Sequence, residues 1–273
     1  MVFLRTNTIK TAADPALARS EAFLWSRLHR ISGRRPLYNI VIPAYNESPR
    51  IRPTVESIYD HFSSRPRDPF EVIVVDDGST DDTRDAVGQF CRHNNFYLTP
   101  KRPNFGKGFS VRQGMLANTA NRALFMDADG STPISELDKL EDSLRAGFDV
   151  AIGSRSVEGA DIKVRQPFYR ETMGRTFNFL VRVFAGLGFE DTQCGFKAFT
   201  RDAAADIFYR QKMDRFAFDV EILYLAQRLG YSTAEVPIVW TDSPRSRVNP
   251  VTDSAQMFWD VLKVRLMHIR DRS

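Results

Sequence analysis

The stretch RALFMDADGSTP, residues Arg122–Pro133, joins an apolar strand to two acidic residues, and this junction decides the fold. Ala123–Met126 is an apolar run of strand length. Asp127 and Asp129 follow it, and burying a carboxylate without a partner is too costly for either to lie inside a core. Both must therefore lie at a strand end and face a positive charge. Because side chains of an extended segment repeat with a period of two, the two carboxylates point in similar directions.

Strand-like and helix-like segments alternate on both sides of this junction. The apolar runs of strand length are YNIVIP (38–43), FEVIVVDD (70–77), FYLTP (96–100) and DVAIGS (149–154). The helical patterns are RPTVESIYDHF (52–62), DTRDAVGQFCRHN (82–94), residues 108–118 and ISELDKLEDSLRAG (134–147). Repeated strand–helix–strand order predicts an α/β fold with a mostly parallel sheet flanked by helices.

Polar clusters follow four of these strands. They are PAYNE (43–47), DDGSTDDT (76–83), DADGS (127–131) and GSR (153–155). Ligands of open parallel sheets bind beyond the carboxyl ends of the strands. The sequence therefore predicts that four loops converge on one rim of the sheet.

Composition and charge exclude several classes of protein. The 273 residues are 42% apolar, enough for a sizeable core, and the formal charge of +4 permits an anionic partner. The basic residues are dispersed and form no recognised nucleic-acid motif, so we expect no nucleic-acid partner. Cys91 and Cys194 lie far apart, which favours neither a disulfide framework nor a zinc site and fits a reducing cytoplasm.

We expect three parts: an amphipathic N-terminal extension (1–36), a central domain (37–245) and a basic amphipathic C-terminal helix (246–273). No segment reaches the ~20 uninterrupted apolar residues of a membrane span, and there is no signal-peptide pattern. The extension could pack on the body or lie on a membrane surface. The residues that share one face of its helix are Leu17, Phe23, Leu24 and Leu28. The apolar face of the C-terminal helix comprises Phe258, Leu262, Leu266 and Ile269.

Two of the rim clusters allow both a ligand-binding and a local interpretation. Asp127, Asp129 and Ser131 form an oxygen-rich site suited to Mg²⁺ or Mn²⁺, although such aspartates also occur in turns and helix caps. In DDGSTDDT, Ser79 or Thr80 could cap a helix that has Asp81 and Asp82 in its first turn. This leaves Asp76 and Asp77 at a strand end, where a carboxylate could accept hydrogen bonds from a nucleobase or ribose.

The motifs together resemble family 2 glycosyltransferases of the GT-A fold, and most closely the dolichyl-phosphate β-glucosyltransferases. They stand in the family's order: VIPAYNE, VVDDGSTDDT, NFGKG, DADGS, GSR, DTQCGFKAFT, FAFDVEILYLAQ and VPIVWTDSPRSRV. The resemblance covers roughly Tyr38 to Arg270 and implies the GT-A fold and a nucleotide-sugar donor.

The resemblance also implies roles for residues around the donor. The residues expected to hold the nucleoside are Pro43, Tyr45, Glu47, Val75 and Asp77. Asp127, Ala128, Asp129 and Ser131 would face the metal and diphosphate, and Arg155 would contact phosphate. Ser131 stands where mannose synthases commonly carry Gln, which favours UDP-glucose over GDP-mannose. Lys107 in NFGKG has either an ordinary loop role or a phosphate contact, and no catalytic task is assigned to it.

On the acceptor side, the resemblance makes Asp219 a candidate base or sugar-hydroxyl anchor, with Glu221 beside it in a substrate-binding role. The local alternative is helix capping by Asp219 and a solvated Glu221. An anionic acceptor needs cations, and a cationic, apolar helix also suits a lipid phosphate at a bilayer surface. The cations of one such segment are Arg165, Arg170, Arg175 and Arg182, of which Arg170 is expected at the reaction and Arg175 in binding. The alternative is a helix that packs on the core and carries these arginines on its solvated face. Arg247, in Ser246–Val248, corresponds to a family element that touches the donor diphosphate.

The expected function is metal-dependent, inverting transfer of glucose from UDP-glucose to a polyprenyl phosphate, which gives a β-linked product. Mg²⁺ or Mn²⁺ is the expected cofactor, and the protein is expected to be cytoplasmic and peripherally bound to the membrane surface. The alternatives are a GDP-mannose-dependent polyprenyl-phosphate mannosyltransferase, a sugar transferase with a soluble hydroxyl acceptor, and a non-catalytic nucleotide-binding scaffold.

Overall fold

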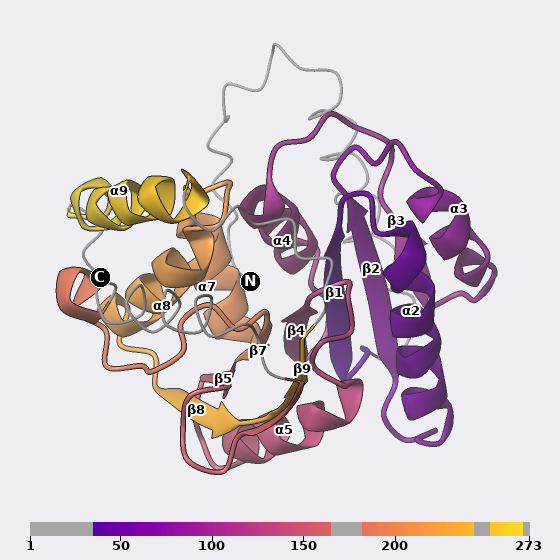
Figure 1. Ribbon diagram of the computed structural model, residues 1–273. Helices are drawn as coiled ribbons and strands as arrows, with labels where there is room; N and C mark the ends of the chain where they lie inside the picture. The colour runs from indigo at the N-terminus through magenta and orange to yellow at the C-terminus, as the bar shows by residue number, and fades with distance from the viewer. Residues whose placement is uncertain (1–34, 165–181, 243–251, 270–273) are drawn as a thin grey trace, which may run out of the picture.

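A computed structural model describes residues 35–164, 182–242 and 252–269 (Figure 1). The expectations for residues 1–34, for Arg165, Arg170 and Arg175, and for Ser246–Val248 lie outside these described residues. Within the described ranges, no helix has both the length and the apolar character needed to cross a bilayer.

A seven-stranded sheet forms the centre of the molecule, in the order β3-β2-β1-β4-β7-β5-β8. Neighbouring strands run parallel except around β7, which is antiparallel to both β4 and β5. The prediction of a mostly parallel sheet is therefore confirmed, whereas β7 was not expected as a strand. The strands are β1 (Tyr38–Ala44), β2 (Phe70–Asp76), β3 (Phe96–Leu98), β4 (Arg122–Met126), β5 (Val150–Ser154), β7 (Phe196–Thr200) and β8 (Thr233–Pro237).

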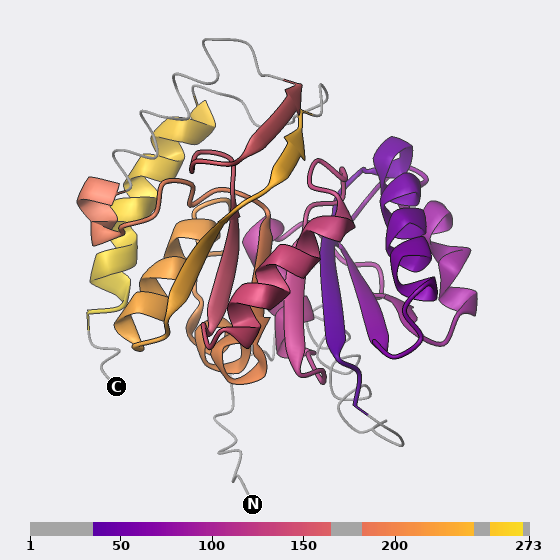
Figure 2. The ribbon, with the colours of Figure 1, turned by 90° about the horizontal axis from the view of Figure 1, so that it is seen from below.

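Helices cover both faces of the sheet (Figures 1 and 2). Side chains alternate along each strand, so Ile40 and Ile42 of β1 pack on one face while Val41 packs on the other. The first face is covered by α2 (Ser48–Ser63), α3 (Thr83–Gly88) and α5 (Leu137–Arg145). The second is covered by α4 (Lys107–Leu116), α7 (Arg201–Arg210), α8 (Phe218–Arg228) and α9 (Thr252–Met267). The sheet is thus buried on both sides, and its strands are continuous apolar runs for that reason.

The short elements complete the fold. The 3₁₀ helices are η1 (Phe90–Arg92) and η2 (Ile134–Glu136), and η3 (Arg182–Gly186) is a π-helix. Strand β6 (Asp161–Val164) pairs with β9 (Val239–Thr241) in a separate two-stranded sheet. The pattern at 82–94, expected as one helix, forms α3 and then η1. The expected capping of this helix by Ser79 or Thr80 is wrong, because α3 begins only at Thr83 and has no side-chain cap hydrogen bond.

A helix, α9 (Thr252–Met267), occupies the described part of the C-terminal segment that was expected to be helical. Val261, Val264 and His268, which share one face, are buried against the body, and α9 contacts α8 and η3 there. On the face predicted to be apolar, Leu266 and Ile269 are 69% and 62% exposed. The helix is therefore apolar on the side that faces away from the protein as well.

Gly114 permits the close contact between α4 and β1. A Cβ atom at this position would lie 2.3 Å from Cγ1 of Val41, a β-branched residue in a buried strand. We expect Gly114→Ala to lower the free energy of unfolding by about 1–3 kcal/mol through overpacking. Urea denaturation should detect this loss. Gly88→Ala, at the end of α3 with no neighbour within 4 Å, is the matched control and should not destabilise the protein.

Candidate active site

Two adjoining cavities open at the rim predicted from the sequence. The larger, of about 420 Å³, lies beyond the carboxyl ends of β1, β2 and β4. The smaller, of about 230 Å³, lies between the loops after β4 and β5 and the start of β7. Lys107, Asp127, Asp129 and Phe216 line both cavities. All four loops named in the sequence analysis contribute to their walls, so the predicted convergence is confirmed.

The Asp127 carboxylate is held at the boundary of the cavities. The Asp127 backbone N–H donates to the carbonyl of Gly195, at 3.0 Å, where β4 meets the segment that leads into β7. Lys107, the first residue of α4, places its Nζ 2.6 Å from Asp127 Oδ1. Burial alone would lower the pKa of Lys107, but the carboxylates of Asp127 and Asp219 raise it above its ordinary value. The positive partner required by the sequence argument is therefore Lys107, which stays charged.

Asp129 also lines both cavities. Its Oδ1 accepts a hydrogen bond from the backbone N–H of Ser131, at 3.0 Å, and its Oδ2 lies 3.8 Å from Arg50 Nη1. Arg50, from α2, also pairs with Glu47 and lines the larger cavity. Sequence reasoning missed Arg50, because only the fold brings α2 to the end of β4.

The two carboxylates fit a divalent ion that is shared with a substrate. Among the described residues, no group of three or more His, Cys, Asp or Glu side chains could hold a metal ion. Mg²⁺ commonly binds through one or two carboxylates together with substrate phosphates, and Asp127 and Asp129 meet that requirement. A Cβ atom at Gly195 would lie 2.1 Å from Asp127 Oδ2, so only glycine leaves room for this carboxylate.

Four of the five residues expected to hold a nucleoside line the larger cavity. They are Pro43, Tyr45, Glu47 and Asp77, and Ala128 joins them in its wall. Val75 does not line either cavity, since it is fully buried in the sheet and packs against α4.

The paired aspartates at the end of β2 have protein partners. Asp77 accepts hydrogen bonds from the backbone N–H groups of Phe105, at 3.0 Å, and Gly106, at 2.7 Å. Asp77 therefore holds the loop that leads into α4. Burial raises the pKa of Asp77, and these hydrogen bonds oppose the shift. Asp76 pairs with Arg84 Nη1 at 2.8 Å.

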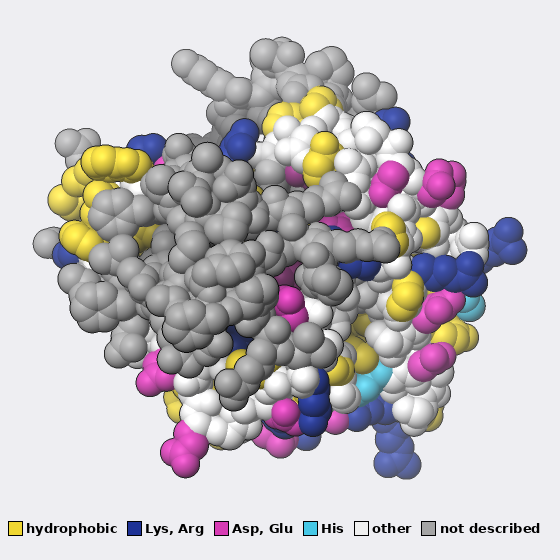
Figure 3. Space-filling view, viewed as in Figure 1, with side chains coloured by type: hydrophobic (Ala, Val, Ile, Leu, Met, Phe, Trp, Pro, Cys, Tyr) yellow, Lys and Arg dark blue, Asp and Glu magenta, His cyan; other side chains and the backbone are white. Residues whose placement is uncertain are grey.

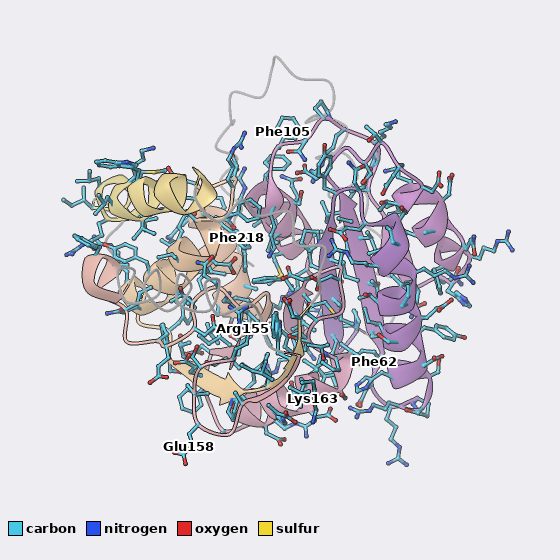
Figure 4. All side chains as sticks on the ribbon, viewed as in Figure 1. Phe62, Phe105, Arg155, Glu158, Lys163 and Phe218 are labelled. Carbon is cyan, nitrogen blue, oxygen red and sulfur yellow. The ribbon has the colours of Figure 1, made fainter. Side chains whose placement is uncertain are left out.

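Arg155, after β5, lines the smaller cavity near the centre of the molecule (Figure 4). Its Nε and Nη2 donate to the two oxygens of Asp191 at 2.7 and 2.9 Å, and its guanidinium lies 5.3 Å from the Trp240 ring centroid. Burial raises the pKa of Asp191, but Arg155 overcomes this effect and holds it below its usual range. Sequence reasoning missed Asp191 and Trp240, although both lie within quoted motifs.

Asp219 lines the smaller cavity but is only 2% exposed. Its Oδ1 lies 2.5 Å from Nζ of Lys197, which is fully buried. The capping alternative is wrong, because Asp219 lies inside α8 and the N-cap is Ala217. Lys197 was missed, and the only sequence signal was a lysine within the apolar run FKAFT.

Glu221 has a different environment. It is fully buried, lines neither cavity, and accepts hydrogen bonds from the backbone N–H groups of Lys212 and Met213, each at 2.8 Å. His268, which directly follows α9, places its Nε2 2.6 Å from Glu221 Oε1. The solvated alternative is therefore wrong, and the predicted substrate contact is not supported by this position. Instead, Glu221 fixes the backbone at residues 212–213, shortly before Phe216, which lines both cavities.

The remaining candidates, Arg170, Arg175 and Arg247, lie outside the described residues. Ser131 lines the smaller cavity, as expected for a residue beside the aspartates. Its carbonyl accepts the N–H of Thr241 at 2.9 Å, which ties this loop to β9.

Comparison with known proteins agrees with this geometry. The model of the family described as "Glycosyl transferase family 2" matches residues 39–208. A dolichyl-phosphate β-glucosyltransferase of Drosophila melanogaster is 35% identical, covering 98% of this chain and 82% of its own length. Its Homo sapiens namesake is 34% identical, covering 85% and 75%. The structure of glucosyl-3-phosphoglycerate synthase from Mycobacterium tuberculosis with Mn²⁺, UDP and glucosyl-3-phosphoglycerate matches with a TM-score of 0.58, 21% identity and coverage of 89% and 81%. The GT-A fold is thereby confirmed.

The contact between Gly195 and Asp127 can be tested directly. Gly195→Ala should push the Asp127 carboxylate out of place and weaken binding of UDP with Mn²⁺ by at least about tenfold, a loss of about 1.4 kcal/mol. Isothermal titration calorimetry measures this affinity. Gly188→Ala is the matched control, because its Cβ would meet no atom within 4 Å. Equal affinities for the two variants would contradict the assignment.

Proposed function

Because this chain belongs to glycosyl transferase family 2, we propose that it transfers glucose from UDP-glucose to a polyprenyl phosphate and forms a β-linked product. One observation carries the proposal: two cavities adjoin, and the same two carboxylates and one lysine line both. A donor in one cavity and an acceptor in the other would meet at these side chains. The names of the relatives supply the substrate class.

The larger cavity suits the nucleotide end of the donor. Tyr45 offers an aromatic surface at its mouth, and its floor is formed by Pro43 and Ala44 at the end of β1. The diphosphate would then lie by Asp127, Asp129 and Lys107, where Lys107 pairs with Asp127 and Arg50 lies near Asp129. When bound there, Mg²⁺ or Mn²⁺ would stabilise the negative charge that grows on the diphosphate as it leaves.

The smaller cavity suits the transferred sugar and the acceptor phosphate. An oxygen of the acceptor phosphate attacks the anomeric carbon on the face opposite UDP, the bond from that carbon to the diphosphate oxygen breaks, and inversion gives the β-linked product. A phosphate monoester is already anionic near neutral pH, so it needs little help from a base. Asp219 therefore orients a sugar hydroxyl, and Arg155 supplies positive charge. We propose that Arg170 and Arg175 bind the acceptor phosphate and Arg247 the donor diphosphate.

A turnover assay tests this function. Incubation with UDP-glucose, a short polyprenyl phosphate and Mn²⁺ should release UDP and give a glucosylated lipid that extracts into organic solvent. EDTA should abolish turnover, and Asp129→Ala should lower kcat at least about 100-fold, as expected for loss of electrostatic stabilisation of a leaving group. Asp142→Ala, on the exposed face of α5, should leave the rate unchanged.

Other outcomes of this assay separate the alternatives. Faster turnover with GDP-mannose would indicate a mannosyltransferase, and a sugar product that stays in the aqueous phase would indicate a soluble acceptor. Full turnover in EDTA would overturn the metal-dependent mechanism.

We also propose that α9 holds the protein on a membrane surface. Trp259 and Leu266 are 61% and 69% exposed and lie on one face of the helix with Lys263 between them, and Ile269 is nearby. Apolar side chains also gather at the end of the molecule that α9 occupies (Figure 3). Exposed aromatic and aliphatic side chains interspersed with cations are typical of helices that lie in a bilayer interface. This position would bring the enzyme to a lipid-borne acceptor.

Cosedimentation with vesicles that contain an anionic phospholipid tests this role. The double variant Trp259→Ser/Leu266→Ser should weaken vesicle binding at least about tenfold, because it removes two apolar side chains that would insert into the bilayer. Tyr209→Ser, an equally exposed aromatic position on α7, is the control and should bind as the wild type does. Wild-type protein that stays in the supernatant would contradict membrane binding.

A further inference from the structure

A lysine without solvent exposure lies behind the smaller cavity. Lys197 is the second residue of β7, and its cross-strand neighbours are Phe125 of β4 and Ile152 of β5. Both neighbours are fully buried. Lysine is almost never buried to this degree unless its charge is paired. The position is therefore an apolar site in the middle of the sheet that contains an ammonium group.

The ammonium group of Lys197 has two oxygen partners. Its Nζ donates to the carbonyl of Cys194 at 2.6 Å and to Asp219 Oδ1 at 2.5 Å, and it lies 5.2 Å from the centroid of the Phe125 ring. Asp219 comes from the first turn of α8, on a different element. Lys197 therefore connects the segment before β7 to the one carboxylate of α8 that lines a cavity.

The Asp219 carboxyl group has a pKa above its ordinary value. Burial raises this pKa, and the charges of Lys197 and Lys107 offset part of that shift. A protonated carboxyl group would donate a hydrogen bond from one oxygen, whereas an ionised one accepts at both. The contact with Lys197 also fixes the rotation of the carboxylate, because it engages Oδ1.

Stability alone does not explain the pair. Replacing a buried ion pair by apolar residues of similar volume is often neutral or stabilising, because the ions lose their hydration. An apolar residue at position 197 would extend the second face of the core, where Phe125, Ile152 and Phe199 already pack. The chain instead has a charged pair whose acidic member reaches the cavity.

We propose that Lys197 is a positioning residue for sugar transfer: it holds the Asp219 side chain in the orientation in which the carboxylate accepts a hydrogen bond from a hydroxyl of the transferred sugar. The inference rests on the proposed function, since it places that sugar in the smaller cavity. Lys197 does not line either cavity, and of its two oxygen partners only Asp219 does.

A double-variant cycle tests this dependence. The four proteins are the wild type, Lys197→Met, Asp219→Asn and the double variant, each assayed for kcat and for the KM of UDP-glucose. Each single change should lower kcat at least about tenfold while the KM changes less than about threefold. The double variant should be within about twofold of Asp219→Asn, because Lys197 has no further role once the carboxylate is gone.

Controls separate positioning from loss of the fold. Lys197→Met alone leaves Asp219 buried without its partner and should unfold at lower urea concentration, whereas the double variant removes both charges and should regain stability. If Lys197→Met does not fold, comparing the kcat of the double variant with that of Asp219→Asn still shows whether Lys197 acts through Asp219. Lys163→Met, at an exposed lysine of β6, should change neither rate nor stability.

The outcomes distinguish the two proposals. A double variant at least about tenfold slower than Asp219→Asn would show that Lys197 acts independently and would overturn its positioning role. Wild-type protein that releases no UDP from UDP-glucose would instead overturn the proposed function, and this inference with it.

Discussion

The ion pair between the Asp127 carboxylate and the Lys107 ammonium group organises the site. Asp127 directly follows β4, in the middle of the sheet, and its partner Lys107 is the first residue of α4. Gly195 leaves the space that this carboxylate fills. Asp77 accepts hydrogen bonds from the backbone of the loop that precedes α4, and these bonds fix the position at which α4 begins. The start of α4, the loop before it and the segment at Gly195 are thus all positioned around the Asp127 carboxylate.

Charge pairing continues through the smaller cavity. Arg155 is paired with Asp191, Lys197 with Asp219 and Lys107 with Asp127, and each pair joins segments distant in sequence. Buried pairs of this kind contribute little net stability, because desolvation offsets their attraction. Their benefit is geometric, since each fixes the direction of a group that lines the cavity. This is the preorganisation that a transfer reaction between two charged substrates requires.

Sequence reasoning found the elements with local signals. The strands β1, β2, β4 and β5 are continuous apolar runs bounded by turn residues, so both their existence and the convergence of their loops could be predicted. Sequence reasoning missed β7, because the apolar run FKAFT is interrupted by the charged Lys197, whose partner Asp219 lies 22 residues further along the chain. The two alternatives for Asp219 and Glu221 failed for the same reason: each carboxylate has its partners on another element. Non-local pairing cannot be read from spacing.

The hydrogen bond between His268 and Glu221 links the outermost helix to the interior. The same Glu221 carboxylate holds the backbone of Lys212 and Met213, and the Lys212 ammonium group donates to the carbonyl of Met267 at the end of α9. A tilt of α9 must therefore break these bonds or carry residues 212–213, and with them the nearby wall at Phe216. A displacement of α9 at the surface would thus change the shape of the two cavities in which the substrates would meet.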